Sequence, residues 1–328
     1  MPRNKISTPE VGGLMLHDHN RDGIDRRGFL KCMAWAGTGA LCVIEGGVLQ
    51  SHALGAQLGS QIKAHKRGTV SFVQISDSHM GFNKPANPDV IATLKAAVDK
   101  INALPEPPEF ILHTGDITHL SKPEEFDNVD QILKATNKEI FFVPGEHDVL
   151  NDEGAMFRER YAKSSRGAGW YSFEKNGVHF VGLVNVMNLK AGGLGALGQE
   201  QLEWLEDDVK HLKSSTPIIV FAHIPLWSVY PQWGWGTDDG AQALSYLKKF
   251  GSVTVLNGHI HQTMQKVEGN VTFHTAFSTA FPQPAPGTAQ GPGPMKVPAD
   301  KLRSVLGITD VNYVQGKHAL GLVDSTLA

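Results

Sequence analysis

The sequence predicts an α/β fold built on parallel strands. Between residues 69 and 148, three short apolar runs alternate with two segments of helical periodicity. The order strand, helix, strand, helix, strand is typical of a βαβαβ unit, whose strands are parallel. Five apolar runs along the chain also end in Asp, His or both. Ligands of α/β folds bind beyond the carboxyl ends of such strands, so the pattern predicts a site there.

The first half of this domain supplies the βαβαβ unit. Thr69 to Ile75 alternates and then runs apolar, which predicts the first strand. Phe110 to Leu112 and Ile140 to Phe142 are the next two apolar runs. The segments between these strands, Pro88 to Ala103 and Glu124 to Ala135, carry apolar residues at helical spacing and are predicted as helices.

The second half mixes hairpins with further strands and helices. Asn176-Gly177 separates two strand-like runs and predicts a β-hairpin. Residues 281–298 are rich in Pro and Gly and are predicted as a loop. The other expected elements are helices at Gly198 to Leu212, Asp239 to Phe250 and Ala299 to Leu306, strands at Pro217 to Phe221, Val253 to Leu256 and His318 to Val323, and a second hairpin turning near Gly269-Asn270.

Composition restricts the chemistry of the site. The chain has 328 residues, is 41% hydrophobic and carries a formal net charge of -3, which does not indicate nucleic acid or an anionic membrane as its main partner. Cys32 and Cys42 are its only cysteines, and both lie near the N-terminus. Any metal held by the rest of the chain must therefore be bound by His and carboxylates, which suits Zn, Fe or Mn.

The N-terminal segment has the features of an export signal. Arg26-Arg27-Gly28-Phe29-Leu30-Lys31 precedes a mildly apolar run from Cys32 to Ile44 and resembles a twin-arginine signal. The run has 13 residues, too few to span a bilayer as a helix. We therefore expect residues 1–55 to be a targeting segment read by the twin-arginine export machinery, and residues 56–328 to form one domain in the periplasm or outside the cell. The alternative is an N-terminal helix of a cytoplasmic protein.

The five strand endings share one chemistry. After Pro144, the run Gly145-Glu146-His147-Asp148 places three ionisable residues in succession, which is unsuitable for a core. The carboxyl ends of parallel strands meet at one edge of a sheet, so such residues are expected to converge on a metal. The other endings are Asp77-Ser78-His79, His113-Thr114-Gly115-Asp116, Phe221-Ala222-His223 and Asn257-Gly258-His259-Ile260-His261.

This order of motifs, from about Thr69 to about Ser278, resembles the calcineurin-like metallophosphoesterase family. The run from Gly115 to His119 looks most like its class III cyclic-nucleotide phosphodiesterase branch. The resemblance implies a four-layer α/β/β/α sandwich of two mixed sheets flanked by helices. It also implies two metal ions, the first held by Asp77, His79, Asp116 and His261, and the second by Asp116, Glu146, His223 and His259.

The resemblance further implies a mechanism and a function. A hydroxide bridging the two metals would attack phosphorus, while the metals neutralise charge on the phosphoryl oxygens. His147 would stabilise the phosphoryl group or protonate the leaving oxygen, and Asp148 would hold the His147 ring in its working tautomer. The expected protein is an exported dinuclear phosphodiesterase acting on a small phosphoester. A broad phosphomonoesterase, a non-catalytic scaffold of the same fold and a structural metal site without turnover are the alternatives.

Glu146 departs from the family, which normally has Asn before the catalytic His. Two hypotheses follow from the extra negative charge. Glu146 would balance a trivalent ion such as Fe(III), or it would favour a diester monoanion over a monoester dianion. A third reading has Glu146 turned away, with the second metal site weak or empty.

Several residues near the motifs have two readings. His119 is a candidate for substrate contact, whereas His113 and His274 are expected to be packing or strand histidines. The aromatic residues after His223 could form a wall for the organic part of a substrate or pack within their own loop; they are Trp227, Tyr230, Trp233 and Trp235. The loop 281–298 is read as a lid or as a spacer.

Overall fold

The computed structural model describes residues 40–45, 48–53, 69–314 and 320–328. By its contacts the chain divides into residues 1–39 and 40–328, and every described residue belongs to the second unit. Arg26 to Lys31 lie outside the described residues, so the export signal stays a prediction. Within the expected targeting segment, β1 (Ala40–Glu45) and β2 (Val48–Ala53) form an antiparallel hairpin.

The first large sheet contains the predicted βαβαβ unit. Its strand order is β13-β12-β3-β4-β5. Strands β3, β4 and β5 are parallel to one another, and β12 runs antiparallel to both of its neighbours, β3 and β13. The side chain of Asp89 caps α2 by accepting from the backbone N–H of Ala92. The elements are β3 (Thr69–Ile75), α2 (Val90–Asn102), β4 (Phe110–His113), α3 (Pro123–Leu133), β5 (Glu139–Phe142), β12 (Gly307–Val314) and β13 (Gly321–Thr326).

The second sheet has the order β10-β11-β9-β8-β7-β6, with parallel strands inside and an antiparallel strand at each edge. Asn176 and Gly177 both have positive φ, 49° and 82°, as expected for the predicted hairpin turn. The strands are β6 (Tyr171–Lys175), β7 (Val178–Gly182), β8 (Ile218–Phe221), β9 (Val253–Asn257), β10 (Gln265–Glu268) and β11 (Val271–Thr275).

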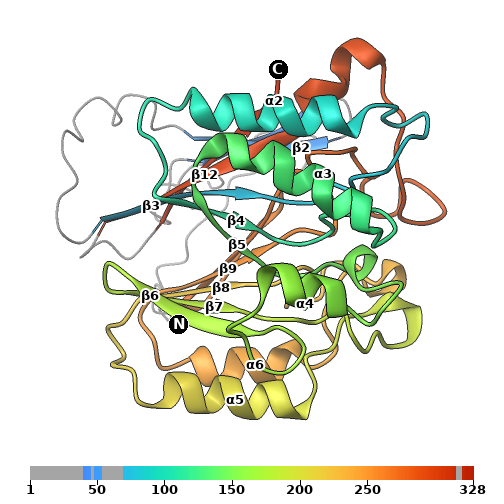
Figure 1. Ribbon diagram of the computed structural model, residues 1–328. Helices are drawn as coiled ribbons and strands as arrows, with labels where there is room; N and C mark the ends of the chain where they lie inside the picture. The colour runs from blue at the N-terminus through green and yellow to red at the C-terminus, as the bar shows by residue number, and fades with distance from the viewer. Residues whose placement is uncertain (1–39, 46–47, 54–68, 315–319) are drawn as a thin grey trace, which may run out of the picture. The chain divides into compact units, whose positions relative to one another are not determined.

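The two sheets pack face to face with helices outside. Phe72 and Phe110 of the first sheet meet Phe180 and Phe221 of the second in one buried cluster. Helices α2 and α3 cover the outer face of the first sheet, and α5 (Gln199–Lys210) and α6 (Gly240–Leu247) cover that of the second (Figure 1). The predicted four-layer α/β/β/α sandwich is confirmed. Within the described part of the chain, no helix combines the length and apolar character needed to cross a membrane.

Three elements differ from expectation. Strand β12 was not predicted, although Thr309, Val311 and Tyr313 are buried in alternation with less buried residues, as in a strand with one buried face. Helix α4 (Ala155–Tyr161) was also not predicted, and its seven residues are too few for a clear periodicity. The segment expected as a helix from Ala299 is a 3₁₀ helix, η6 (Ala299–Val305). The other 3₁₀ helices are η2 (Lys134–Thr136), η3 (Glu146–Asp148), η4 (Ala191–Gly193) and η5 (Pro231–Trp233).

Candidate metal centre

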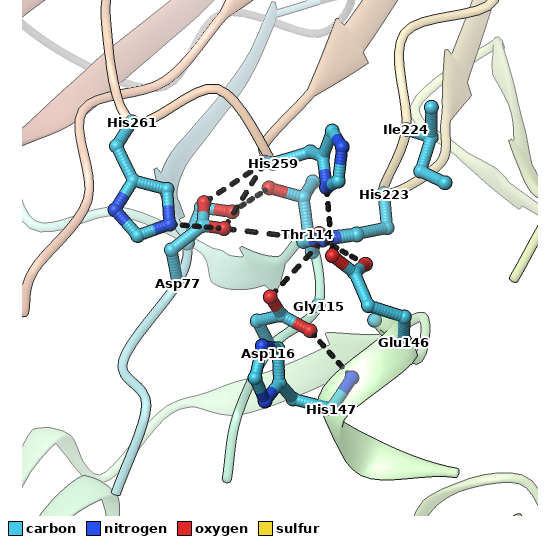
Figure 2. A network of polar contacts seen from close by, with 12 residues as sticks. Asp77, Thr114, Gly115, Asp116, Glu146, His147, His223, Ile224, His259 and His261 are labelled. Carbon is cyan, nitrogen blue, oxygen red and sulfur yellow. Dashed lines mark hydrogen bonds and ion pairs between the residues drawn. The ribbon is translucent and has the colours of Figure 1, made fainter. Parts of the chain in front are cut away.

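All seven predicted metal ligands come together at the carboxyl ends of strands from both sheets. In Figure 2 the side chains of Asp77, Asp116, Glu146, His223 and His261 converge on a small space. Each follows a strand directly, because the chain leaves the sheet at that point. Asp77 and His79 follow β3, Asp116 follows β4, Glu146 follows β5, His223 follows β8, and His259 and His261 follow β9.

The first group of potential ligands consists of Asp77, His79 and His261, all of them buried. His261 Nε2 lies 3.2 Å from Asp77 Oδ1 and 3.2 Å from His79 Nε2. His79 Nε2 is also 3.4 Å from Asp116 Oδ2. Two imidazole nitrogens and two carboxylate oxygens thus face one another, an arrangement that suits a shared cation.

The second group consists of Glu146, His223 and His259. The two oxygens of Glu146 lie 3.0 Å from His223 Nε2 and 3.0 Å from His259 Nδ1. Glu146 therefore points into the site, and the reading in which it turns away is wrong. His223 Nε2 is 3.4 Å from Asp116 Oδ2, the same oxygen that faces His79 in the first group. Asp116 Oδ2 is common to both groups.

The donor set fits metal ions. Three buried atoms, Glu146 Oε2, His223 Nε2 and His259 Nδ1, face one another at these short distances, yet none makes a hydrogen bond of good geometry with any described residue. Leaving a buried polar atom without a partner costs about 1–3 kcal/mol, and one cation would satisfy all three. The far ring nitrogens are already used, because His223 Nδ1 donates to Thr114 O at 2.7 Å and His261 Nδ1 to Phe281 O at 2.5 Å. Such second partners fix the tautomer that leaves Nε2 free for a metal.

The backbone around the ligands is strained. Five of the seven have positive φ: Asp77 at 54°, His79 at 39°, Asp116 at 51°, His259 at 70° and His261 at 53°. A non-glycine residue in this region costs on the order of 1–3 kcal/mol and persists where the surroundings impose it. Strain concentrated in this way is typical of functional sites.

The glycines of the motifs are required by close approach. A Cβ on Gly145 would collide with the side chain and backbone N–H of Asp116. A Cβ on Gly115 would lie 2.6 Å from His223 Nδ1, and one on Gly258 2.6 Å from Asp77 Oδ2. Larger residues at these positions would displace ligands.

The electrostatics favour charged carboxylates and a cation. Burial would raise the pKa of Asp77 and Glu146, but the neighbouring histidines outweigh it and lower both. Burial, with the other histidines nearby, holds the pKa of His79 well below its usual value. Burial also lowers the pKa of His223, yet Asp116 and Glu146 outweigh this and raise it well above normal. The carboxylates thus favour positive charge where the second group lies.

His147 is placed beside both groups. Its Nδ1–H donates to the carbonyl of His119 at 2.7 Å, which leaves Nε2 for another partner. The ring stacks on His119 at 4.9 Å and meets His79 edge to face at 4.8 Å. Burial lowers the pKa of His147, but Asp116 and Glu146 oppose it and raise the value. A raised pKa suits a group that donates a proton.

Asp148 does not hold the His147 ring, so that expectation is wrong. Its carboxylate accepts from the backbone N–H groups of Gly145, Ile117 and Thr118 at 2.9, 3.1 and 2.8 Å, and from Thr118 Oγ1 at 2.8 Å. Burial and the nearby Asp116 raise the pKa of Asp148 to about 7 despite these donors. Adjacent residues of the η3 turn point in different directions, so Asp148 joins the loops after β4 and β5 while the His119 carbonyl orients His147.

A cavity of about 280 Å³ opens on the metal ligands. Trp233 and Trp235 line this cavity, where the predicted substrate wall would lie, whereas Trp227 packs against Phe273 with ring centroids 5.6 Å apart. That the two tryptophans contact a substrate stays a prediction. The loop 281–298 contributes to the wall as well. Lining residues include His79, Phe82, Lys84, Asp116, His119, Glu146, His147, Trp233, Trp235, His259, Phe281, Gln283, Pro292, Gly293 and Pro294.

Sequence reasoning missed Lys84 and Gln283, which stand in loops with no motif to mark them. His119 lines the cavity, and its predicted contact with substrate stays a prediction. His113 and His274 have packing roles: His113 Nε2 is hydrogen-bonded to Ser78 Oγ at 2.9 Å, and His274 Nε2 to Asp324 Oδ1 at 3.0 Å.

Comparison with curated proteins gives relatives that act on phosphoesters. The chain is 24% identical to the 3',5'-cyclic-nucleotide phosphodiesterase alr5338 of Nostoc sp. over 65% of its length and 79% of the relative's. It is 30% identical to the serine/threonine-protein phosphatase CPPED1 of Mus musculus over 49% of its length, and 25% identical to a probable glycerophosphodiester phosphodiesterase GpdQ of Arcobacter nitrofigilis over 47%. It spans only 58% and 57% of the latter two proteins.

Solved structures share the fold. A dimetal phosphatase from Danio rerio superposes with a TM-score of 0.58 at 15% identity, covering 80% of this chain and 100% of that one. The purple acid phosphatase PPD1 of yellow lupin gives 0.57 at 14% identity, covering 80% of this chain and 52% of that one. The calcineurin-like phosphoesterase family model matches residues 70–263, more than half of the chain, and this region holds every predicted ligand. The chain therefore belongs to the calcineurin-like phosphoesterase family and is a metal-dependent phosphoester hydrolase.

Proposed function

We propose that this protein hydrolyses phosphodiester bonds with two metal ions that share Asp116. The observation that carries the proposal is the position of Asp116 Oδ2, 3.4 Å from a nitrogen of each ligand group. One oxygen so placed would serve two cations, as in two-metal hydrolases. Asp77, His79 and His261 would complete the first site, and Glu146, His223 and His259 the second.

The bound cations would supply Lewis-acid stabilisation of the phosphoryl oxygens and a water of lowered pKa. The protein's own groups have separate tasks. His147, oriented by the carbonyl of His119, offers Nε2 as a donor to the phosphoryl or leaving oxygen. Asp148 positions the loops that carry Asp116 and His147. Trp233 and Trp235 form the apolar side of the cavity that receives the organic group.

Glu146 supports a diester over a monoester. With Asp77, Asp116 and Glu146 ionised, the three carboxylates leave two divalent cations with one net positive charge, where Asn at position 146 would leave two. A monoester is a dianion above its second pKa of about 6, whereas a diester is a monoanion. Glu146 in place of Asn therefore weakens the electrostatic attraction of the dianion more than that of the monoanion, by simple Coulomb reasoning. The alternative for Glu146, compensation of Fe(III) beside a divalent ion, would restore the missing charge.

The test uses the full chain supplied in turn with Mn, Zn and Fe, assayed on bis-p-nitrophenyl phosphate and p-nitrophenyl phosphate. Faster cleavage of the diester is the expected result. Faster cleavage of the monoester would favour the phosphomonoesterase alternative, in line with the relative named a phosphatase. No turnover with any of these metals would favour a scaffold or a structural metal site.

Export to the periplasm or beyond is a second part of the proposal. It rests on Arg26-Arg27 followed by Phe29, Leu30 and Lys31 ahead of the apolar run. Replacing both arginines by lysine is expected to retain the protein in the cytoplasm of a bacterium with a twin-arginine pathway, as cell fractionation would show. Unchanged export of that variant would contradict this part.

A further inference from the structure

We propose that His119 is a positioning residue of the metal centre, because its ring fixes the tautomer of the expected ligand His79. The inference rests on the proposed function, since it assigns a task to a residue beside the first ligand group. His119 Nδ1 lies 3.5 Å from His79 Nδ1 and is its hydrogen-bond partner. The carbonyl of His119 accepts from His147 Nδ1 at 2.7 Å. One residue thus contacts both an expected metal ligand and the expected proton donor.

The buried histidine ligands share one arrangement, in which Nε2 faces the site and Nδ1 faces a second partner. His223 and His261 each donate from Nδ1 to a backbone carbonyl. His79 Nε2 also faces the site, because it lies 3.4 Å from Asp116 Oδ2 and 3.2 Å from His261 Nε2. The partner of His79 Nδ1 is the His119 ring. This partner is a side chain, so a substitution can remove it.

The positions of the protons follow from this arrangement. A neutral imidazole carries a proton on one ring nitrogen, and a metal binds the other. With Nε2 of His79 directed at the cation, Nδ1 carries the proton and donates it, so His119 Nδ1 is the acceptor. Without an acceptor at position 119, the proton of His79 can move to Nε2, where it competes with the metal. The His119 ring therefore favours the tautomer of His79 that binds a cation.

Contacts on several sides hold the His119 ring in place. It stacks on the His147 ring with centroids 4.9 Å apart and an angle of 17° between the planes. It meets the rings of Phe82 and His79 edge to face, with centroids 5.2 and 5.6 Å apart. Its backbone N–H donates to the carbonyl of Met80 at 2.8 Å. These contacts limit rotation of the ring, so Nδ1 stays directed at His79.

Two substitutions at position 119 separate the acceptor from the ring. His119→Asn loses the ring but keeps an acceptor, because the amide oxygen is two bonds from Cβ, as Nδ1 of histidine is. His119→Phe keeps a ring that can pack against Phe82 and His147 but has no acceptor. Both variants retain the backbone carbonyl that orients His147, so that contact is matched between them.

The measurement is the zinc affinity of the full chain, obtained by titrating the zinc-loaded protein with a chelator of known affinity. His119→Phe should weaken one of the two dissociation constants about tenfold. This is the lower end of the roughly 10–100-fold effect of such outer partners, because the 3.5 Å contact is long. His119→Asn should bind zinc as tightly as the unmodified protein. So should His211→Phe, which makes the same change at an exposed position.

The two variants give opposite rankings for the two explanations. If packing of the ring mattered instead of its acceptor, His119→Asn would lose zinc affinity; that loss overturns the inference, as does unchanged affinity in His119→Phe. A third zinc ion per chain, lost in both variants, would show that His79 and His119 hold a cation between them and also overturns it. If His119→Phe does not fold, His119→Leu, which also lacks an acceptor, replaces it with the same expected loss. Hydrolysis of bis-p-nitrophenyl phosphate is scored separately, so the inference and the proposed function fail independently.

Discussion

Replacing Glu146 by Asn tests the charge argument at the second metal group. The Glu146 carboxylate is partly buried, with 24% of the side chain exposed, and lies 3.0 Å from His223 Nε2 and His259 Nδ1. The substitution removes one negative charge from the ligand set and keeps an oxygen ligand. A dianionic monoester carries one more negative charge than a diester, so their relative transition-state stabilisation should change by one charge–charge interaction.

The magnitude follows from Coulomb's law. Two unit charges 4 Å apart interact by about 1 kcal/mol in water and about 4 kcal/mol at an effective dielectric constant of about 20. A partly exposed site lies between these limits, so we take about 2 kcal/mol, which corresponds to roughly a 30-fold change in a rate ratio. Glu146→Asn should therefore raise the ratio of p-nitrophenyl phosphate to bis-p-nitrophenyl phosphate cleavage, as kcat/KM, by about that factor.

The assay measures both substrates at pH 8 on metal-loaded protein, with metal content determined on the same samples. Glu159→Gln, an exposed change of the same charge on α4, serves as the control and should leave the ratio unaltered. An unchanged ratio in Glu146→Asn, with both metals still bound, would refute the charge argument. Loss of one metal would instead show that the negative charge is needed for binding at the second group.

Three further outcomes follow from the structure. Asp148→Ala leaves several buried donors without their acceptor and should lower the free energy of unfolding in urea by roughly 3 kcal/mol; a loss below about 1 kcal/mol would contradict its positioning role. His179 contacts Glu174 at 2.5 Å and Asp208 at 2.7 Å; burial lowers its pKa, but the two carboxylates outweigh this and raise it. The stability contributed by protonated His179 is therefore full below the unfolded pKa of about 6.5 and is lost as pH rises through the folded pKa. His179→Gln should thus lower the free energy of unfolding more at pH 6 than at pH 9. Equal losses of free energy at the two pH values would count against this reasoning. Lys84→Ala should raise KM for bis-p-nitrophenyl phosphate by about threefold at low salt, an effect that 0.5 M NaCl should largely remove if it is electrostatic; a salt-independent change would point to packing.

The sequence predicted the ligands because each directly follows a strand. Four of the ligands lie within three residues of a strand end: Asp77, Asp116, His223 and His259. Parallel strands end at the same edge of a sheet, so residues that follow such strands lie close together in the fold. The hairpin at Asn176-Gly177 was equally local, since the two residues themselves determine the turn. Such features need no knowledge of distant contacts.

Contacts between separate loops could not be read in this way. Asp148 was assigned to its neighbour His147, yet its partners come from the turn after β4, some 30 residues earlier. Lys84 and Gln283 reach the cavity from loops whose paths depend on tertiary packing. Buried and less buried residues alternate along β12, but a short alternating run does not by itself identify a strand. Its partner, β3, lies more than 200 residues earlier in the chain, so the pairing could not be predicted locally.

The central claim is that two cations share Asp116, and metal content tests it most directly. Elemental analysis of the full chain, loaded with a single metal and freed of excess, is expected to give two ions per chain. Asp116→Asn should hold one ion or none, because the neutral amide lacks the negative charge that holds two cations next to one shared oxygen. A single ion in the unmodified protein, or two ions held equally well without the Asp116 carboxylate, would contradict the account.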